Sequence, residues 1–191
     1  MTGLVPVSGA AELFAIAMAP LLGVGRIRAV VRAPAPVLST PSEPVDPVAA
    51  ETVRLAEDLI ATMLVSPGCV GLAASQVGVG AQVFAVDVTG HPKARTVHGV
   101  FVLCNARVVS ASQWQKGREG CMSVPDLTGD VKRAGRLVVV GAVPGTGEEI
   151  EFATDGFEAR ALQHEIDHCA GLLFLDRVAS ADAVHARKVY Q

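Results

Sequence analysis

The chain has 191 residues, of which half are hydrophobic and only 4% are aromatic, and its formal net charge is −3. That length fits one domain with a substantial core, built here mainly from aliphatic side chains. The acidic balance excludes a protein that binds nucleic acid mainly through phosphate contacts, so no sequence-specific nucleic-acid binding is expected. Four cysteines without a CxxC pair indicate reduced thiols and a cytoplasmic location.

The N-terminal part reads as an extension followed by irregular chain. Residues 1–25 form an extension of unknown role, for which a short helix packed on the domain is expected. The apolar run over 13–25 is interrupted by Pro20 and is too short to cross a bilayer, so neither a membrane span nor a signal peptide is expected. The segment RIRAVVRAPAPV (26–37) predicts a strand and then an extended stretch punctuated by prolines.

A first helix is predicted after this stretch. Asp46 and Pro47 suit its N-cap and its first helical position. The apolar residues that follow recur at helical spacing and predict an amphipathic helix with one buried face. That face consists of Val53, Ala56, Leu59, Ile60, Met63 and Leu64.

Short β-like runs separate the first helix from a second one. The runs cover residues 82–87, 100–104, 106–112, 136–143 and 148–153. The second helix is expected from Asp155, with Asp155 and Glu158 spaced as a capping box and Gly171 placed to end it. A helix, several strands and a helix without βαβ alternation favour an α+β fold.

The second helix carries the pattern H-E-x-x-H. His164 and His168 stand one helical turn apart, so both imidazoles project from one face, with Glu165 beside them. This pattern can bind a divalent cation and hold a carboxylate near a bound water. A polar helix without a metal is the alternative, but burying these polar groups without a partner would be costly.

A catalytic metal needs a third protein ligand. No glutamate follows Glu165, and Phe174 occupies the last position of H-E-x-x-H-x-x-G-x-x-H, so the two common zinc-protease patterns are excluded. Cys121, in the loop-like segment REGCMSVP, is the strongest candidate. The alternatives are Asp176, Asp182 and His185.

Three separated motifs resemble those of the peptide deformylases. They are GLAASQVG (71–78), EGCMS (119–123) and QHEIDH (163–168), and they occur in the family's order. The resemblance implies a catalytic domain over 26–178, with mixed or antiparallel strands around a central metal-binding helix. Residues 179–191 are then a C-terminal tail, for which a short exposed helix is expected.

The resemblance also implies the metal site. One divalent ion, Fe²⁺, replaceable by Zn²⁺, Ni²⁺ or Co²⁺, is held by Cys121, His164 and His168, with a water in the fourth position. Glu165 matches the family's general base and acid. It accepts the water proton as the formyl carbon is attacked and passes it to the departing amine.

Four further positions match residues that contact the substrate backbone. The side-chain amide of Gln76 and the backbone N–H of Met122 are expected to donate to the formyl oxygen. Val70 and Gly71 are expected to pair with the peptide as with an added strand.

Other matched positions surround the substrate side chain. Phe157 and Ala161 correspond to residues that line the pocket for methionine. Glu119 belongs to the same part of the site, where an ion pair with Arg133 would fix the EGCMS segment. A solvated surface glutamate is the alternative.

The sequence departs from the family's pattern at three positions. Cys69 stands where glycine is usual, and Met122 replaces leucine without changing the backbone N–H. Cys169 replaces a leucine just after His168. It competes as a ligand, forms a disulfide with Cys121, or is a small buried hydrophobe.

The implied activity is hydrolysis of the N-formyl group of N-terminal formyl-methionine on newly synthesised polypeptides, with release of formate. The partners are N-formylmethionyl peptides, and a transient ribosome contact is left open. One alternative is a hydrolase of a small formamide, and another is a non-catalytic domain whose metal site is closed by Cys169 or His185. A zinc endoprotease ranks last because its third ligand is missing.

Overall fold

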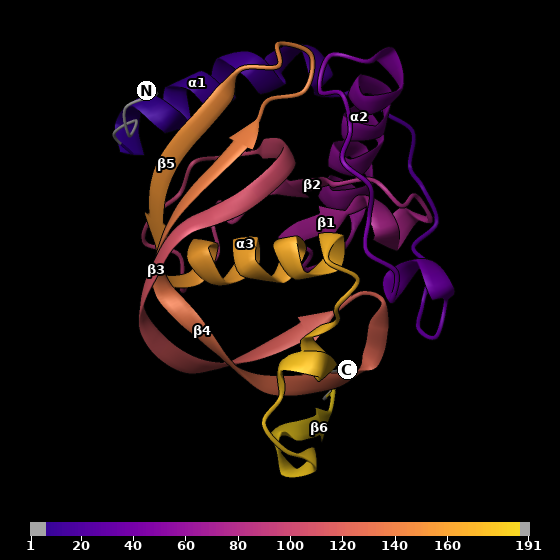
Figure 1. The fold of residues 1–191 in the computed structure, drawn as a ribbon, viewed down its shortest axis with the longest axis vertical. Coiled ribbons are helices and arrows are strands. Elements are labelled where there is room, and N and C mark those ends of the chain that lie inside the picture. The colour runs from indigo at the N-terminus through magenta and orange to yellow at the C-terminus, as the bar shows by residue number, and fades with distance from the viewer. Residues whose placement is uncertain (1–6, 188–191) are drawn as a thin grey trace.

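The computed structural model describes residues 7–187. One sheet curves around a central helix, α3 (Gly156–Cys169), while α1 (Val7–Met18) and α2 (Ala50–Val65) lie outside it (Figure 1). This α+β architecture confirms the fold class predicted from the order of elements. The described residues include no helix that is both long and apolar enough to cross a membrane.

The sheet is antiparallel, with β1 to β5 in sequential order and β6 added beside β4. Its longest part is a ribbon of β3 and β4, in which Ser112 lies opposite Arg136 and Cys121 lies opposite Val124 next to the tight turn. The ribbon therefore carries Cys121 toward α3. The strands are β1 (Gly71–Ala73), β2 (Val83–Val86), β3 (Phe101–Cys121), β4 (Val124–Ala142), β5 (Glu149–Asp155) and β6 (Val184–Ala186).

The five β-like runs predicted between the two helices all lie in strands, but β3 and β4 extend far beyond the runs that marked them. The predicted run ends at residue 112, and residues 113–116 are all exposed, so no alternation of apolar and polar residues reveals them as strand. The prediction of a loop around Cys121 was wrong, because Cys121 is the last residue of β3.

The expected strand at 26–31 and the expected start of α2 were also wrong. The backbone N–H of Arg28 donates to the side chain of Thr62 on α2 at 2.9 Å, and this segment joins no strand.

The helix α2 begins at Ala50 and not at Pro47, because Asp46 closes a turn before it. The carbonyl oxygen of Asp46 accepts from the N–H of Ala49 at 3.2 Å.

The capping box of α3 is not formed, and the expected C-terminal helix is absent as far as residue 187. Asp155 is the N-cap residue, but its carboxylate accepts from Thr96 at 2.8 Å instead of capping the helix. The carboxylate of Glu158 accepts from the backbone N–H of His98 at 2.9 Å.

In the C-terminal tail, residues 181–183 form one 3₁₀ turn followed by β6, and residues 188–191 lie outside the described part.

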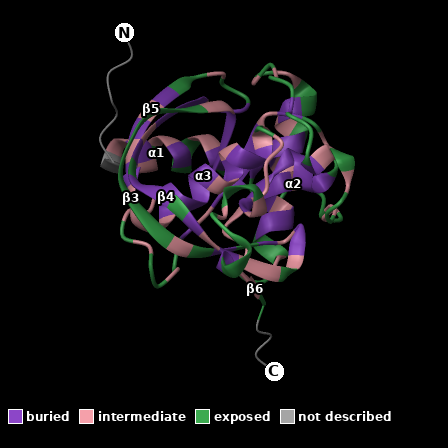
Figure 2. Ribbon diagram, turned by 60° about the horizontal axis from the view of Figure 1, so that its bottom comes forward, coloured by how far each residue is buried: buried purple, intermediate pink, exposed green. Residues whose placement is uncertain are grey.

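One hydrophobic core joins α2, α3 and the strands, and buried residues gather on α3 and the strands that face it (Figure 2). The N-terminal extension contributes to this core through α1. Phe14 is fully buried, stacks on Phe101 with ring centroids 4.6 Å apart and meets Phe152 edge-on at 5.2 Å. The helix α1 is therefore packed as part of the domain.

The change Phe14→Ala is expected to lower the free energy of unfolding by about 3–5 kcal/mol, since it leaves a cavity in an aromatic cluster. Ile16 on the same helix is 68% exposed, so Ile16→Ala serves as the matched control, with an expected change within about 0.5 kcal/mol. Urea unfolding measures both. Equal, small effects of the two changes would show that α1 does not contribute to core stability.

Candidate metal centre

Three potential ligand atoms converge from two elements. Cys121 stands at the end of β3, and His164 and His168 stand on α3, one turn apart. Their ligand atoms all lie within 4.8 Å of one another, and the Cys121 Sγ is 3.3 Å from the His168 Nε2. A thiolate and two imidazoles form a donor set that suits a divalent transition metal with one position left open. Within residues 7–187, no further histidine, cysteine or carboxylate joins this group.

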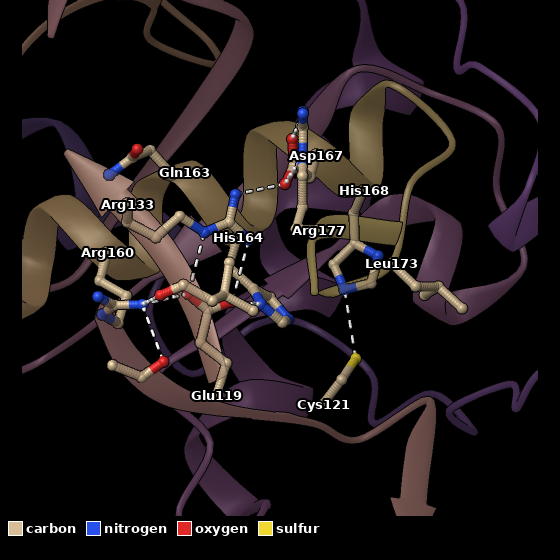
Figure 3. Close-up of polar contacts among 12 residues, drawn as sticks. Glu119, Cys121, Arg133, Arg160, Gln163, His164, Asp167, His168, Leu173 and Arg177 are labelled. Atoms are coloured by element: carbon tan, nitrogen blue, oxygen red, sulfur yellow. Dashed lines mark hydrogen bonds and ion pairs between the residues drawn. The ribbon is translucent and has the colours of Figure 1, made fainter. Parts of the chain in front are cut away.

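Glu119 orients the first of the two histidines. Its Oε2 lies 3.0 Å from the His164 Nδ1, which leaves the other ring nitrogen of His164 for a metal. Arg133 donates to both carboxylate oxygens, at 2.9 and 3.0 Å, and Arg160 donates to Oε1 at 2.7 Å (Figure 3). The predicted pair of Glu119 and Arg133 is confirmed. Since both oxygens are engaged, the carboxylate of Glu119 acts by positioning its neighbours.

Asp167 extends this network on the same helix. It pairs with Arg133 and accepts from Arg177 at 2.6 and 3.0 Å (Figure 3). Neither Asp167 nor Arg160 was selected from the sequence, although their spacing indicates a role. Arg160 lies four residues before His164 and Asp167 lies three residues after it, so both share a helix face with His164.

The buried charges have distinct protonation states. Burial opposes ionisation of Glu119, but hydrogen bonds from His164 and Arg133 outweigh it and lower the pKa of Glu119 to about 2. Burial lowers the pKa of His168 well below its ordinary value, so its imidazole is neutral, as a ligand must be. Burial raises the pKa of Glu165 to about 7.

Glu165 lies where its carboxyl group could exchange protons. Its side chain is buried, and its Oε2 has no hydrogen-bond partner in the described part of the chain. Gly71 lies against it, because a Cβ at position 71 would come within 3 Å of the carboxyl group. An unpartnered buried oxygen beside three converging ligands fits a centre completed by a metal and water.

Gln76 serves a backbone turn and also faces the ligands. Its Oε1 accepts from the backbone N–H of Ala73 at 2.9 Å. Its Nε2 donates to the Cys121 Sγ and to the Ser123 Oγ, both at 3.3 Å. The amide N–H groups therefore point to the edge of the metal centre.

A cavity of about 380 Å³ opens onto these residues. Every site residue predicted from the sequence lines it except His168, which is fully buried behind it. The predicted lining residues are Val70, Gly71, Gln76, Glu119, Cys121, Met122, Phe157, Ala161, His164 and Glu165. Arg118, Arg160 and Arg187 also line the cavity, and sequence reasoning did not select them.

A glycine makes room for one of these arginines. The guanidinium of Arg160 donates to the backbone carbonyls of Gln115 and Val131, both at 3.1 Å. A Cβ at Gly117 would lie 2.7 Å from this guanidinium. Gly117 thus lets the arginine fill the space between α3 and β3, where it forms part of the cavity wall.

Neither Cys69 nor Cys169, the two further cysteines that the sequence placed near the site, joins the ligand group. Cys69 lines the cavity and donates to the carbonyl of Gly71 at 3.1 Å, and burial raises its pKa to about 12. Burial likewise raises the pKa of Cys169 to about 12, and neither sulfur lies among the three converging ligand atoms. His185 contacts Asp130 at 3.3 Å instead. The structure therefore does not support a non-catalytic metal site in which Cys169 or His185 is the fourth protein ligand.

Comparisons with known proteins agree on one family. A family model described as Polypeptide deformylase matches residues 27–184. The chain is 40% identical over 148 residues to a peptide deformylase of Symbiobacterium thermophilum, covering 78% of this chain and 65% of that protein. It is 41% identical over 143 residues to a peptide deformylase of Halothermothrix orenii, covering 75% and 88%.

Solved structures give the same result. A peptide deformylase from Ehrlichia chaffeensis is similar with a TM-score of 0.75 and 31% identity, over 83% of this chain and 91% of that one. A class I type b peptide deformylase from Acinetobacter baumannii with bound Met-Ala-Ser has a TM-score of 0.72 and 32% identity, over 81% and 100%.

The change Glu119→Gln is expected to weaken metal affinity about 10- to 100-fold, because an amide cannot balance the two arginines or fix His164 as a carboxylate does. Competition with a chelator at neutral pH measures the affinity. Glu43→Gln, at an exposed position, is the control. Unchanged affinity in Glu119→Gln would show that the carboxylate does not position the ligand.

Proposed function

The chain belongs to the polypeptide deformylase family, whose metal-dependent members remove the N-formyl group from newly synthesised polypeptides, and we propose that Cys121, His164 and His168 hold its metal ion. Deformylation is accordingly the activity of this chain. The observation that carries the ligand assignment is the convergence of the three donor atoms within 4.8 Å, directly beside Glu165.

We propose Fe²⁺ as the native ion, with Zn²⁺, Ni²⁺ or Co²⁺ able to replace it. The support is the mixed donor set of one sulfur and two imidazole nitrogens, which accepts several divalent ions. When bound, such an ion lowers the pKa of water and polarises the formyl carbonyl.

Glu165 is the proposed proton carrier. With a pKa of about 7, its carboxylate takes a proton from the attacking water as the new C–O bond forms at the formyl carbon. It then gives this proton to the amine nitrogen as the C–N bond breaks. Formate and a free N-terminal amine are the products, so one water is consumed and all atoms are accounted for.

Two donors are proposed for the formyl oxygen as negative charge develops on it. They are the Gln76 Nε2, which already faces the Cys121 sulfur, and the backbone N–H of Met122, which borders the same cavity. One donor of this kind contributes about 2.7–4 kcal/mol of transition-state stabilisation.

The rest of the cavity is proposed to hold the substrate peptide. Val70 and Gly71 border the cavity next to β1 and would pair with the peptide backbone. Phe157 and Ala161, on the α3 wall, would contact the methionine side chain. The Met-Ala-Ser bound in the Acinetobacter structure supports a site for a peptide of this kind.

The wider setting of the enzyme is also a proposal. Residues 26–178 would form the catalytic domain, with residues 1–25 as an extension whose helix completes the core and residues 179–191 as a tail. The four free thiols and the nascent-peptide substrate support a cytoplasmic location. The same substrate supports a transient contact with the ribosome.

Anaerobically purified protein is expected to contain one iron per chain and to release formate from formyl-Met-Ala. Glu165→Gln should retain the metal and lose about 10²–10⁴-fold in kcat, because only the proton carrier has been removed. A coupled formate assay and elemental analysis of the same samples measure both. A loaded protein that releases no formate, or a Glu165→Gln variant with unchanged kcat, would contradict this assignment.

A further inference from the structure

A second cavity, of about 730 Å³, adjoins the proposed active site along the outer edge of β3. From Arg107 to Cys121, β3 pairs only with β4 among the described strands, so its other edge borders this cavity. We call the cavity the basic groove. Its charged lining residues are Lys93, Arg95, Lys116, Arg118, Arg136, Arg160 and the single carboxylate Asp155.

Several of these cations have no counterion. Lys93, Arg95 and Arg136 form no ion pair within residues 7–187, and all three are exposed. Lys116 shares Asp130 with Arg118, at 3.7 and 2.6 Å respectively. In a chain whose net charge is −3, this local excess of positive charge stands out.

The ribbon of β3 and β4 adds further positive charge. Lys116 lies directly opposite Lys132 on the neighbouring strand, and like charges in such a pair destabilise a sheet. Trp114, which is the only tryptophan of the chain and is 56% exposed, lies two residues away and lines the groove as well. The surface therefore combines unneutralised cations with an exposed aromatic ring.

The groove and the active-site cavity share a wall. Lys93, Arg118, Phe157 and Arg160 line both. A peptide whose formyl group lies at the metal centre must leave the cavity across its rim, and this wall is part of that rim. Its next residues then enter a basic environment.

We propose that the basic groove binds acidic side chains of the substrate in the first few residues after formyl-methionine. The inference rests on the proposed function, since it extends the peptide site beyond the metal centre. A peptide fits better than a nucleic acid because the groove adjoins the cavity in which the substrate already lies. Acidic side chains of the peptide would supply the counterions that Lys93, Arg95 and Arg136 lack.

The kinetic test compares formyl-Met-Ala-Ser-Glu-Glu-Glu with formyl-Met-Ala-Ser-Lys-Lys-Lys on the metal-loaded enzyme. At low salt, kcat/KM should favour the acidic peptide by roughly tenfold, mainly through KM, and the preference should shrink at high salt. Equal kcat/KM values for the two peptides would overturn the proposal.

A double variant assigns the preference to the groove. Arg95→Glu with Lys116→Glu should abolish or reverse it, while the rate on formyl-Met-Ala stays unchanged. The carboxylate introduced at position 116 would face Lys132 but would lose the contact of Lys116 with Asp130, so urea unfolding of the variant is measured to check that the ribbon is intact. Arg54→Glu, an exposed change on α2, is the matched control and should leave the preference intact. A preference that survives the double variant would refute the role of the groove.

Binding without catalysis separates failure of this proposal from failure of the proposed function. The product-like peptide Met-Ala-Ser-Glu-Glu-Glu should change the fluorescence of Trp114 at lower concentrations than its lysine counterpart, whether or not formate is released. If instead a single-stranded RNA oligomer changes the fluorescence and neither peptide does, the groove is a nucleic-acid surface and the proposal is wrong.

Discussion

The buried carboxylate of Glu119 joins the elements that carry the site. It comes from β3, two residues before Cys121, and contacts Arg133 on β4 and both Arg160 and His164 on α3. A buried ion pair stabilises a fold only when its lone pairs and protons are satisfied, and each oxygen of Glu119 here has two partners. The network thereby fixes the position of Cys121 relative to the helix that carries His164 and His168.

The fold makes this network possible by surrounding α3 with the sheet. The helix faces the large core on one side and the ribbon of β3 and β4 on the other, which explains why a buried helix can carry charged residues. Asp167 and Arg177 continue the charge pairing toward the C-terminal end of the site. Gly117 and Gly71 contribute by lacking a side chain, since one leaves room for Arg160 and the other for Glu165.

The H-E-x-x-H motif predicted that His164 and His168 lie together, because it fixes their geometry within one helix, and the EGCMS motif placed Cys121 with them, as the structure shows. The order of elements also predicted the α+β class. The full length of β3 could not be predicted, since residues 113–116 are all exposed without apolar–polar alternation and are held as strand by pairing with β4. The roles of Arg160 and Asp167 depend on contacts of α3 with Glu119 on β3 and Arg133 on β4, which lie far from them in sequence. The side chain of Asp155 does not cap α3 as expected, because its carboxylate accepts a hydrogen bond from Thr96, which is distant in sequence.

X-ray absorption by the zinc-loaded protein tests the metal centre most directly. We expect one sulfur neighbour at about 2.3 Å and three nitrogen or oxygen neighbours at about 2.0–2.2 Å, with the sulfur lost in Cys121→Ser. Two sulfur neighbours would contradict the account, because Cys69 or Cys169 would then close the site. A sulfur that persists in Cys121→Ser would show that Cys121 is not the ligand.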